Sequence, residues 1–185
     1  EVPVHSYLAW QRALDGWRFQ DVTRAFRRLR LVKSMEEIDW LRRGAELTDA
    51  ALQHLIDHVR AGLREYELGA LVEAEALRRG GLPHLCYLSS GPQEGAGACV
   101  PRQNLSGRVI GPGDVVNTEI SVSYWGYSGQ AHRPIFVQSE PVDLYRRLWD
   151  CSVEAYHRGI EQLHASATSE DLLDAADVIA ERGFT

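Results

Sequence analysis

The sequence predicts an α+β fold with a largely antiparallel sheet and helices on the outer face of that sheet. Three observations predict it. Two segments before residue 80 carry apolar residues at helical spacing, residues 115–137 alternate polar and apolar residues about a central turn, and two further helical segments follow. The order helix, helix, strand, loop, hairpin, helix, helix is typical of α+β domains.

The first helical segment after residue 30 begins with a capping signal. Ser34 stands before the helix and Glu37 follows three residues later, which is the spacing of a capping box. Apolar residues then recur with helical periodicity: Ile38, Leu41, Ala45, Leu52, Leu55 and Val59. A second helix is expected from Glu65 to Arg79, where Gly80 and Gly81 end it. The aromatic-rich residues 1–30 predict a partial helix and a connector.

The middle of the chain predicts strands and turns. A short strand is expected at 84–90, followed by a long loop rich in glycine and proline. The turn "GPGD" at 111–114 leads into a strand at 115–123, and "YWGY" returns the chain into a strand at 127–137.

Two helices are expected after the hairpin. Pro141 suits the first position of a helix over 141–164, because proline is tolerated there. A last helix is expected from Thr168 or Ser169 to Arg182, with Gly183 ending it.

The predicted hairpin carries polar side chains on one face. Side chains alternate faces along a strand. Asn117, Glu119, Ser121 and Ser123 therefore share one face, and Ser128, Gln130 and His132 share a face of the second strand. The other face of the first strand carries the apolar row, which is Val116, Thr118, Ile120 and Val122. This row should face the helices, so the polar row should lie on the open side of the sheet. That polar row fits either a solvated surface or a ligand site, with Tyr124, Trp125 and Tyr127 as a possible pocket wall.

Composition and charge restrict the function classes. The 185 residues carry a net charge of −6, so the basic surface of a nucleic-acid-binding protein is not indicated, and no apolar run reaches the length of a membrane span. We expect neither nucleic acid nor membrane as a partner. Three cysteines at unrelated spacings suit a reducing compartment, which predicts a cytoplasmic protein. The chain begins at Glu1 without methionine, and we expect it to be part of a longer protein.

Three stretches carry a family resemblance: "LRLVKSMEEIDWLRRGAELTDAAL", "SSGP" and "GPGDVVNTEISVSYWGYSGQAHRPIFV". From about residue 29 onward the chain resembles the pita-bread family of aminopeptidase P, prolidase, methionine aminopeptidase and creatinase. The resemblance implies the pita-bread fold, apparently truncated. It also implies that residues 1–30 are a connector or the tail of an N-terminal domain, that 31–185 begin the catalytic-type domain, and that the protein forms a homodimer.

The resemblance also indicates which residues of this chain occupy the family's metal-binding positions. Metallopeptidases of this family hold two divalent ions with aspartates eleven residues apart on the hairpin, and this chain has Glu119 and Gln130 there. A neutral amide cannot bridge two cations. The family's loop histidine is also missing, with Ala98 or Cys99 near its place. The sequence therefore predicts no metal and no cofactor. If a metal does bind, a divalent ion such as Mn, Co or Zn is expected.

Loss of metal ligands leaves other chemistry open, because the resemblance includes creatinase, which hydrolyses a C–N bond with protein groups alone. We assign acid and base roles to Glu119 and His132. Asn117, Gln130, Arg133 and Tyr127 are the predicted substrate-binding residues, with Arg133 anchoring either the hairpin or an anion. In the alternative interpretation, Glu119 and His132 are a structural hydrogen-bonded pair.

Three function classes follow. The first is a hydrolase that acts without a dinuclear metal site on a C–N bond of a small polar or peptide-like substrate. The second is a metal-dependent Xaa-Pro aminopeptidase or dipeptidase, and the third is a non-catalytic binding module. Two minor candidates are interpreted as structural: the pair His54 and His58, one helical turn apart on a solvated face, and Cys99 as a small loop residue.

Overall fold

The structure is a computed structural model that describes residues 2–94 and 101–184. The chain divides into two compact units, Glu1–Trp40 and Leu41–Thr185. The division falls inside the long helix α3 (Met35–His58), so each unit is considered by itself.

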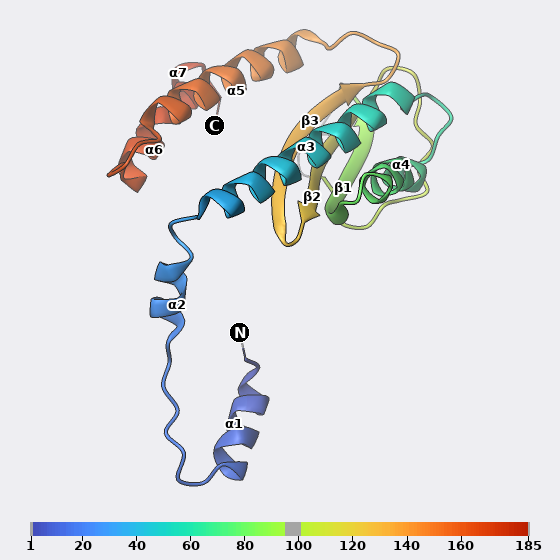
Figure 1. Ribbon diagram of the computed structural model, residues 1–185. Coiled ribbons are helices and arrows are strands. Elements are labelled where there is room, and N and C mark those ends of the chain that lie inside the picture. The colour runs from blue at the N-terminus through green and yellow to red at the C-terminus, as the bar shows by residue number, and fades with distance from the viewer. Residues whose placement is uncertain (1, 95–100, 185) are drawn as a thin grey trace. The chain divides into compact units, whose positions relative to one another are not determined.

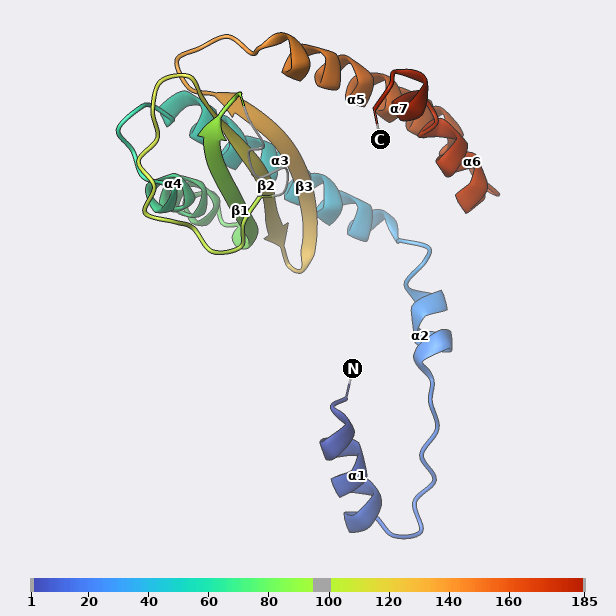
Figure 2. The ribbon, with the colours of Figure 1, turned by 180° about the vertical axis from the view of Figure 1, so that it is seen from behind.

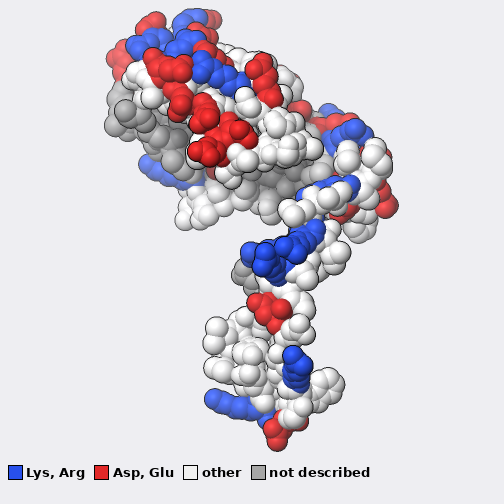
Figure 3. All heavy atoms as spheres, turned by 90° about the vertical axis from the view of Figure 1, so that its left-hand side faces the viewer, with Lys and Arg blue, Asp and Glu red and all other residues white. Residues whose placement is uncertain are grey.

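The first unit holds two short helices and the start of α3. α1 spans Val4–Ala13 and α2 spans Thr23–Leu29, and neither helix has a buried residue. The predicted partial helix is thus two helices. Figure 3 shows basic side chains gathered over α2, where Arg27 and Arg28 occupy the last turn. The capping box before α3 is confirmed, because the Ser34 amide donates to Glu37 Oε2 at 2.7 Å and the Glu37 amide donates to Ser34 Oγ at 3.2 Å.

The second unit is built on a three-stranded antiparallel sheet in the order β1-β2-β3. β1 spans Leu82–Pro92, β2 spans Asp114–Tyr124 and β3 spans Tyr127–Phe136 (Figure 1). β1 is longer than the predicted strand at 84–90. The hairpin between β2 and β3 turns at Trp125 and Gly126, which both have positive φ, 49° and 85°. Glycine adopts positive φ at no steric cost, whereas it is an uncommon conformation for a tryptophan.

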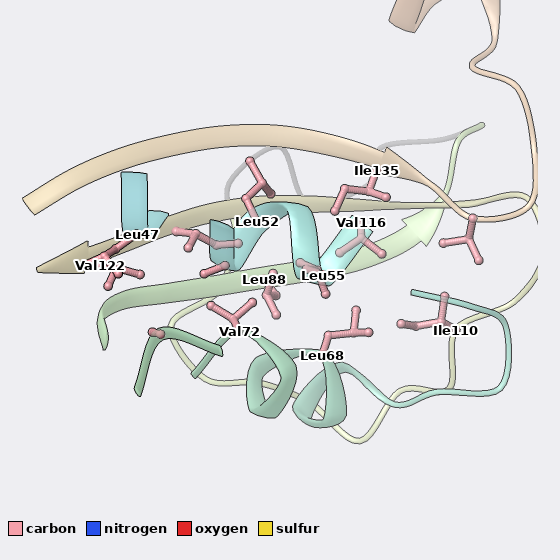
Figure 4. Packing of buried hydrophobic residues seen from close by; sticks show 14 residues of the cluster. Leu47, Leu52, Leu55, Leu68, Val72, Leu88, Ile110, Val116, Val122 and Ile135 are labelled. Carbon is pink, nitrogen blue, oxygen red and sulfur yellow. The ribbon is translucent and has the colours of Figure 1, made fainter. Parts of the chain in front are cut away.

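α3 and α4 (Glu65–Arg78) cover one face of the sheet (Figures 1 and 2). α4 ends at Arg78, close to the predicted end, and Gly80 follows with φ +80°. Figure 4 shows the apolar cluster between helices and sheet. Its labelled members come from α3, α4, the strands and the turn before β2: Leu47, Leu52, Leu55, Leu68, Val72, Leu88, Ile110, Val116, Val122 and Ile135.

α3 approaches the hairpin closely through two glycines. A Cβ at Gly44 would lie 2.6 Å from the Tyr127 carbonyl oxygen, and one at Gly129 would lie 2.5 Å from Ala45 Cα. Larger residues would push the helix away from β3. The sheet therefore meets α3 backbone to backbone at its hairpin end.

The chain after the sheet forms three helices, which differs from the prediction. α5 spans Asp143–Gln162, and its N-cap is Val142, so the placement of Pro141 at the first helical position was wrong. The predicted last helix is two: α6 (Ser169–Ala175), capped by Thr168, and α7 (Val178–Glu181). The break follows from packing, because Ala175 and Val178 are both buried and both α6 and α7 contact α5.

Candidate active site

The hairpin register brings Glu119, Gln130 and His132 together. Glu119 on β2 pairs with His132 on β3, and Ser121 pairs with Gln130. Directly opposite and diagonal residues on one face of an antiparallel pair are within reach of each other. The Gln130 amide Nε2 donates to Glu119 Oε1 at 2.6 Å and lies 3.3 Å from His132 Nε2. His132 Nε2 lies 3.7 Å from the same carboxylate oxygen.

These three residues lie on the open face of the sheet, as the alternation predicts. The Glu119 side chain is 19% exposed and the His132 side chain 60%. The prediction that the whole polar row is open was wrong at its other end. Ser121 and Ser123 are buried, and their hydroxyls donate to the carbonyls of Gly129 (2.6 Å) and Leu82 (3.3 Å).

A hollow of about 410 Å³ lies beside this cluster. Asn117, Thr118 and His132 line it from the sheet, and α5 contributes an aromatic wall in Tyr145 and Trp149. The remaining lining residues are Pro101, Arg133, Pro134, Leu148 and Ser152. The hollow is large enough for a small substrate and combines apolar walls with a few polar groups, as ligand sites do.

Two predicted site residues lie apart from the cluster. Arg133 pairs with Thr118 on the helix-facing row, donates from Nη1 to the His132 carbonyl at 2.7 Å, and has its guanidinium 5.8 Å from the centre of the Trp149 ring. Tyr127 pairs with Tyr124 at the hairpin turn, five positions along β3 from His132. At about 3.3 Å per residue, that is roughly 16 Å.

Sequence reasoning missed the α5 wall, which is formed by Tyr145 and Trp149. Tyr145 meets the Phe136 ring of β3 edge-on, with 5.3 Å between ring centres, and Trp149 follows one turn later. The only available signal was the helical spacing of these two aromatics at the start of a helix. Gln93, a buried glutamine after β1 that bonds the N-cap of α5, had no motif at all.

A second carboxylate, Glu65, is buried beneath the loop before β2. It accepts hydrogen bonds from the Ser90 amide (2.7 Å), the Ser90 hydroxyl (2.6 Å) and the Ser106 amide (3.1 Å). The Ser106 hydroxyl also donates to it. Burial by itself would raise the pKa of Glu65, but these bonds outweigh it and lower the pKa. Glu65 is thus fully used in holding the loop.

The minor sequence candidates stay outside the site. The His54 and His58 rings are 4.1 Å apart, and the His58 ring bonds the His54 carbonyl at 2.8 Å, away from the hairpin. Cys99 and Ala98 lie outside the described residues. Across residues 2–94 and 101–184, no three His, Cys, Asp or Glu side chains are grouped so as to hold a metal ion, and no helix is long and apolar enough to cross a membrane.

The three-stranded antiparallel sheet with α3 and α4 packed on one face is the arrangement of the pita-bread class that the sequence predicts. Residues 39–185 match metallopeptidase family M24, and the chain belongs to that family.

Similar proteins include dipeptidases and a creatinase. The chain is 26% identical to the Xaa-Pro dipeptidase of Pyrococcus furiosus over 170 residues, which cover 90% of this chain and 47% of that protein. It is 28% identical to the creatinase of a Bacillus species over 167 residues, covering 88% of this chain and 40% of the creatinase. The chain thus spans about half the length of the curated relatives it matches.

Solved structures give the same fold. The prolidase of Pyrococcus horikoshii superimposes with a TM-score of 0.87 at 25% identity, over 99% of this chain and 52% of that one. The X-Pro aminopeptidase of Thermotoga maritima superimposes with a TM-score of 0.84 at 23% identity, over 98% and 51%. These likenesses confirm the predicted pita-bread fold.

The metal that the family name implies can be tested against the donor atoms present. Glu119 and Gln130 supply one carboxylate and one neutral amide, and the amide Nε2 is directed at the carboxylate at 2.6 Å. Two bridged divalent cations require several anionic oxygen ligands. Among the described residues, this donor set does not fit a two-cation centre.

Proposed function

We propose that the protein is a hydrolase that cleaves a C–N bond of a small polar or peptide-like substrate without a dinuclear metal centre. The observation that carries the proposal is the contact of Glu119, Gln130 and His132 on the open hairpin face. A carboxylate and an imidazole 3.7 Å apart can share proton transfer, since both groups commonly act as catalytic acids and bases.

In the proposed reaction, Glu119 takes a proton from water as the water oxygen bonds to the electrophilic carbon. Protonated His132 then gives its proton to the departing nitrogen as the C–N bond breaks. Transfer of the proton from Glu119 to His132 restores both groups, through one bridging water molecule because Oε1 and Nε2 are 3.7 Å apart. Gln130 holds the carboxylate in place by its hydrogen bond, and Asn117 orients the substrate from the edge of the hollow.

The two remaining predicted substrate residues are Arg133 and Tyr127. Arg133 lines the hollow and can meet an anionic group there, while its bond to the His132 carbonyl also stiffens β3. Tyr127 stays a prediction from the sequence. The domain boundary at residue 30, the homodimer and the cytoplasmic location likewise stay predictions.

The test is substitution in the full-length protein. Glu119→Ala and His132→Ala should each lower kcat by about 10²- to 10⁴-fold on the best substrate found among small amides, amidines and Xaa-Pro peptides. Glu46→Ala and His58→Ala are matched controls, because both side chains are exposed and lie on α3, across the sheet from the hairpin cluster. Unchanged turnover in both site variants would remove the catalytic assignment.

The relatives that are Xaa-Pro dipeptidases favour a second candidate, a metal-dependent peptidase. Elemental analysis of the purified full-length protein separates the two. Near-stoichiometric manganese, cobalt or zinc, together with loss of activity in a chelator, would support the metal-dependent candidate and exclude the first.

A further inference from the structure

One buried glutamine joins three segments of the chain at the end of the sheet. Gln93 follows β1 directly and is 9% exposed. Its Nε2 lies within bonding distance of the Gly113 carbonyl (3.3 Å), Ser139 Oγ (3.0 Å) and the Glu140 carbonyl (3.2 Å). Its Oε1 accepts from the Val142 amide at 2.9 Å. The side chain thus ties β1 and the turn before β2 to the segment that leads into α5.

The bond to Val142 fixes where α5 begins. Val142 is the N-cap, and its carbonyl accepts hydrogen bonds from the amides of Tyr145 (3.0 Å) and Arg146 (3.2 Å). Because an N-cap sets the position of the first turn, Gln93 holds the start of the helix in register with the sheet. Tyr145 in that turn, and Trp149 one turn later, form the aromatic wall of the hollow.

Few other contacts hold this wall to the sheet. The ring pair Phe136–Tyr145 and the stacking of Arg133 on Trp149 are the aromatic contacts between β3 and α5 in the part of the chain that the structure describes. Both involve side chains that are only partly covered, and α5 packs chiefly on α6 and α7. Rotation or sliding of α5 would therefore open or close the hollow unless its first turn were fixed.

We propose that Gln93 is a positioning residue for substrate binding: by holding the N-cap of α5, it sets the distance between the Tyr145–Trp149 wall and the face that carries His132. It does not line the hollow itself. The proposal rests on the proposed function, because it assigns the hollow to the substrate of that reaction.

The test compares Gln93→Met with wild type in the full-length protein. Methionine keeps the length of the side chain and removes all of its hydrogen bonds. KM should rise about tenfold with kcat within about threefold, since the wall contributes binding in ground and transition states alike. Gln53→Met is the matched control, because Gln53 is an exposed glutamine on α3 that bonds only its neighbour Asp57 among the contacts seen.

Amide hydrogen exchange over residues 142–150 supplies a readout that needs no turnover. Exchange should become faster in Gln93→Met and stay unchanged in Gln53→Met. Faster exchange with an unchanged KM would show that Gln93 supports the fold only and would overturn the proposal, as would unchanged exchange. If wild type hydrolyses none of the substrates, the proposed function fails, while the exchange result still decides whether Gln93 positions α5.

Two further variants keep the test valid if Gln93→Met does not fold. Val142→Pro removes the amide that donates to Gln93 while keeping Gln93 itself, and the Val142 angles of φ −67° and ψ 162° suit proline. Val142→Pro should also raise KM, by a smaller factor than Gln93→Met does. In Gln93→Glu, the protonated acid can donate but the carboxylate cannot, so KM should rise with increasing pH relative to wild type. A KM that follows wild type at every pH in Gln93→Glu would contradict the proposal.

Discussion

The molecule carries two carboxylates near the sheet whose surroundings are opposite in kind. Glu65 on the helix side is 1% exposed and accepts four hydrogen bonds from two serines. Glu119 on the open face is 19% exposed and accepts a bond from one neutral amide, with an imidazole nearby. The Glu65 carboxylate is committed to holding the chain, whereas the Glu119 carboxylate is partly open to solvent.

This difference extends to the two faces of the sheet. The helix-facing row of β2 is closed, with Val116, Ile120 and Val122 fully buried against α3 and α4. The open row offers polar groups that contact one another and a hollow. Substitutions on the closed face should therefore change stability, and substitutions on the open face should change activity.

The largest effect on stability is expected from Glu65→Leu. The substitution leaves the amides and hydroxyls of Ser90 and Ser106 without their acceptor in a buried site, which should lower the free energy of unfolding by about 3–4 kcal/mol. Urea denaturation followed by circular dichroism measures it. Glu73→Leu, an exposed residue on the same helix, is the control and should change stability little. Equal stability of the two variants would contradict the structural role of Glu65.

Gly129→Ala should have the next largest effect. Its Cβ would lie 2.5 Å from Ala45 Cα and 2.9 Å from the Ala45 nitrogen, both backbone atoms that cannot turn aside. Separation of α3 from β3 should lower the free energy of unfolding by about 1–3 kcal/mol. Gly91→Ala on β1 provides the comparison, because nothing lies within 4 Å of its Cβ position. A Gly129→Ala protein as stable as Gly91→Ala would show that α3 can move without loss.

The sequence was sufficient for the elements whose signal is local. The Ser34–Glu37 capping box, the turn at Gly126 and the strict alternation along β2 each depend on residues a few positions apart, so they could be predicted. The alternation also placed Glu119, Gln130 and His132 on one face. Their mutual contact then followed from the short hairpin, because a tight turn leaves only a few possible registers.

Features that depend on distant contacts could not be predicted. Gln93 bonds a residue 49 positions away, and no local pattern connects them. The break between α6 and α7 has neither glycine nor proline, and arises where Ala175 and Val178 are buried. Ser121 belongs to the polar row and is nevertheless buried, with its hydroxyl bonded to the Gly129 carbonyl on the opposite strand.

A smaller effect is expected when pH falls. Burial would raise the pKa of Asp114, but hydrogen bonds from Arg108 and the Gly111 amide outweigh it and lower the pKa, as the serine bonds do for Glu65. A carboxyl group whose pKa is lower in the folded state stabilises the fold above its unfolded pKa of about 4 and loses that contribution as pH falls through the folded value. Stability should therefore decline below about pH 4.

Asp114→Asn separates this contribution from the general effect of acid. The asparagine cannot titrate, so its free energy of unfolding should depend less steeply on pH than that of wild type in urea denaturations at pH 7, 5 and 3.5. At pH 7 the variant should also be less stable, because Arg108 loses its charged partner. Parallel pH curves for the two proteins would mean that Asp114 contributes nothing to the acid sensitivity.

The smallest change in stability is expected from Glu119→Gln, and this variant separates the two faces most clearly. The amide oxygen of glutamine can still accept from Gln130, and the site is partly open to solvent, so the free energy of unfolding should change by less than about 0.5 kcal/mol. Loss of activity at unchanged stability would assign the open face to chemistry. A loss of stability comparable with that of Glu65→Leu would instead make Glu119 a structural carboxylate, and the hairpin cluster would then serve the fold rather than a reaction.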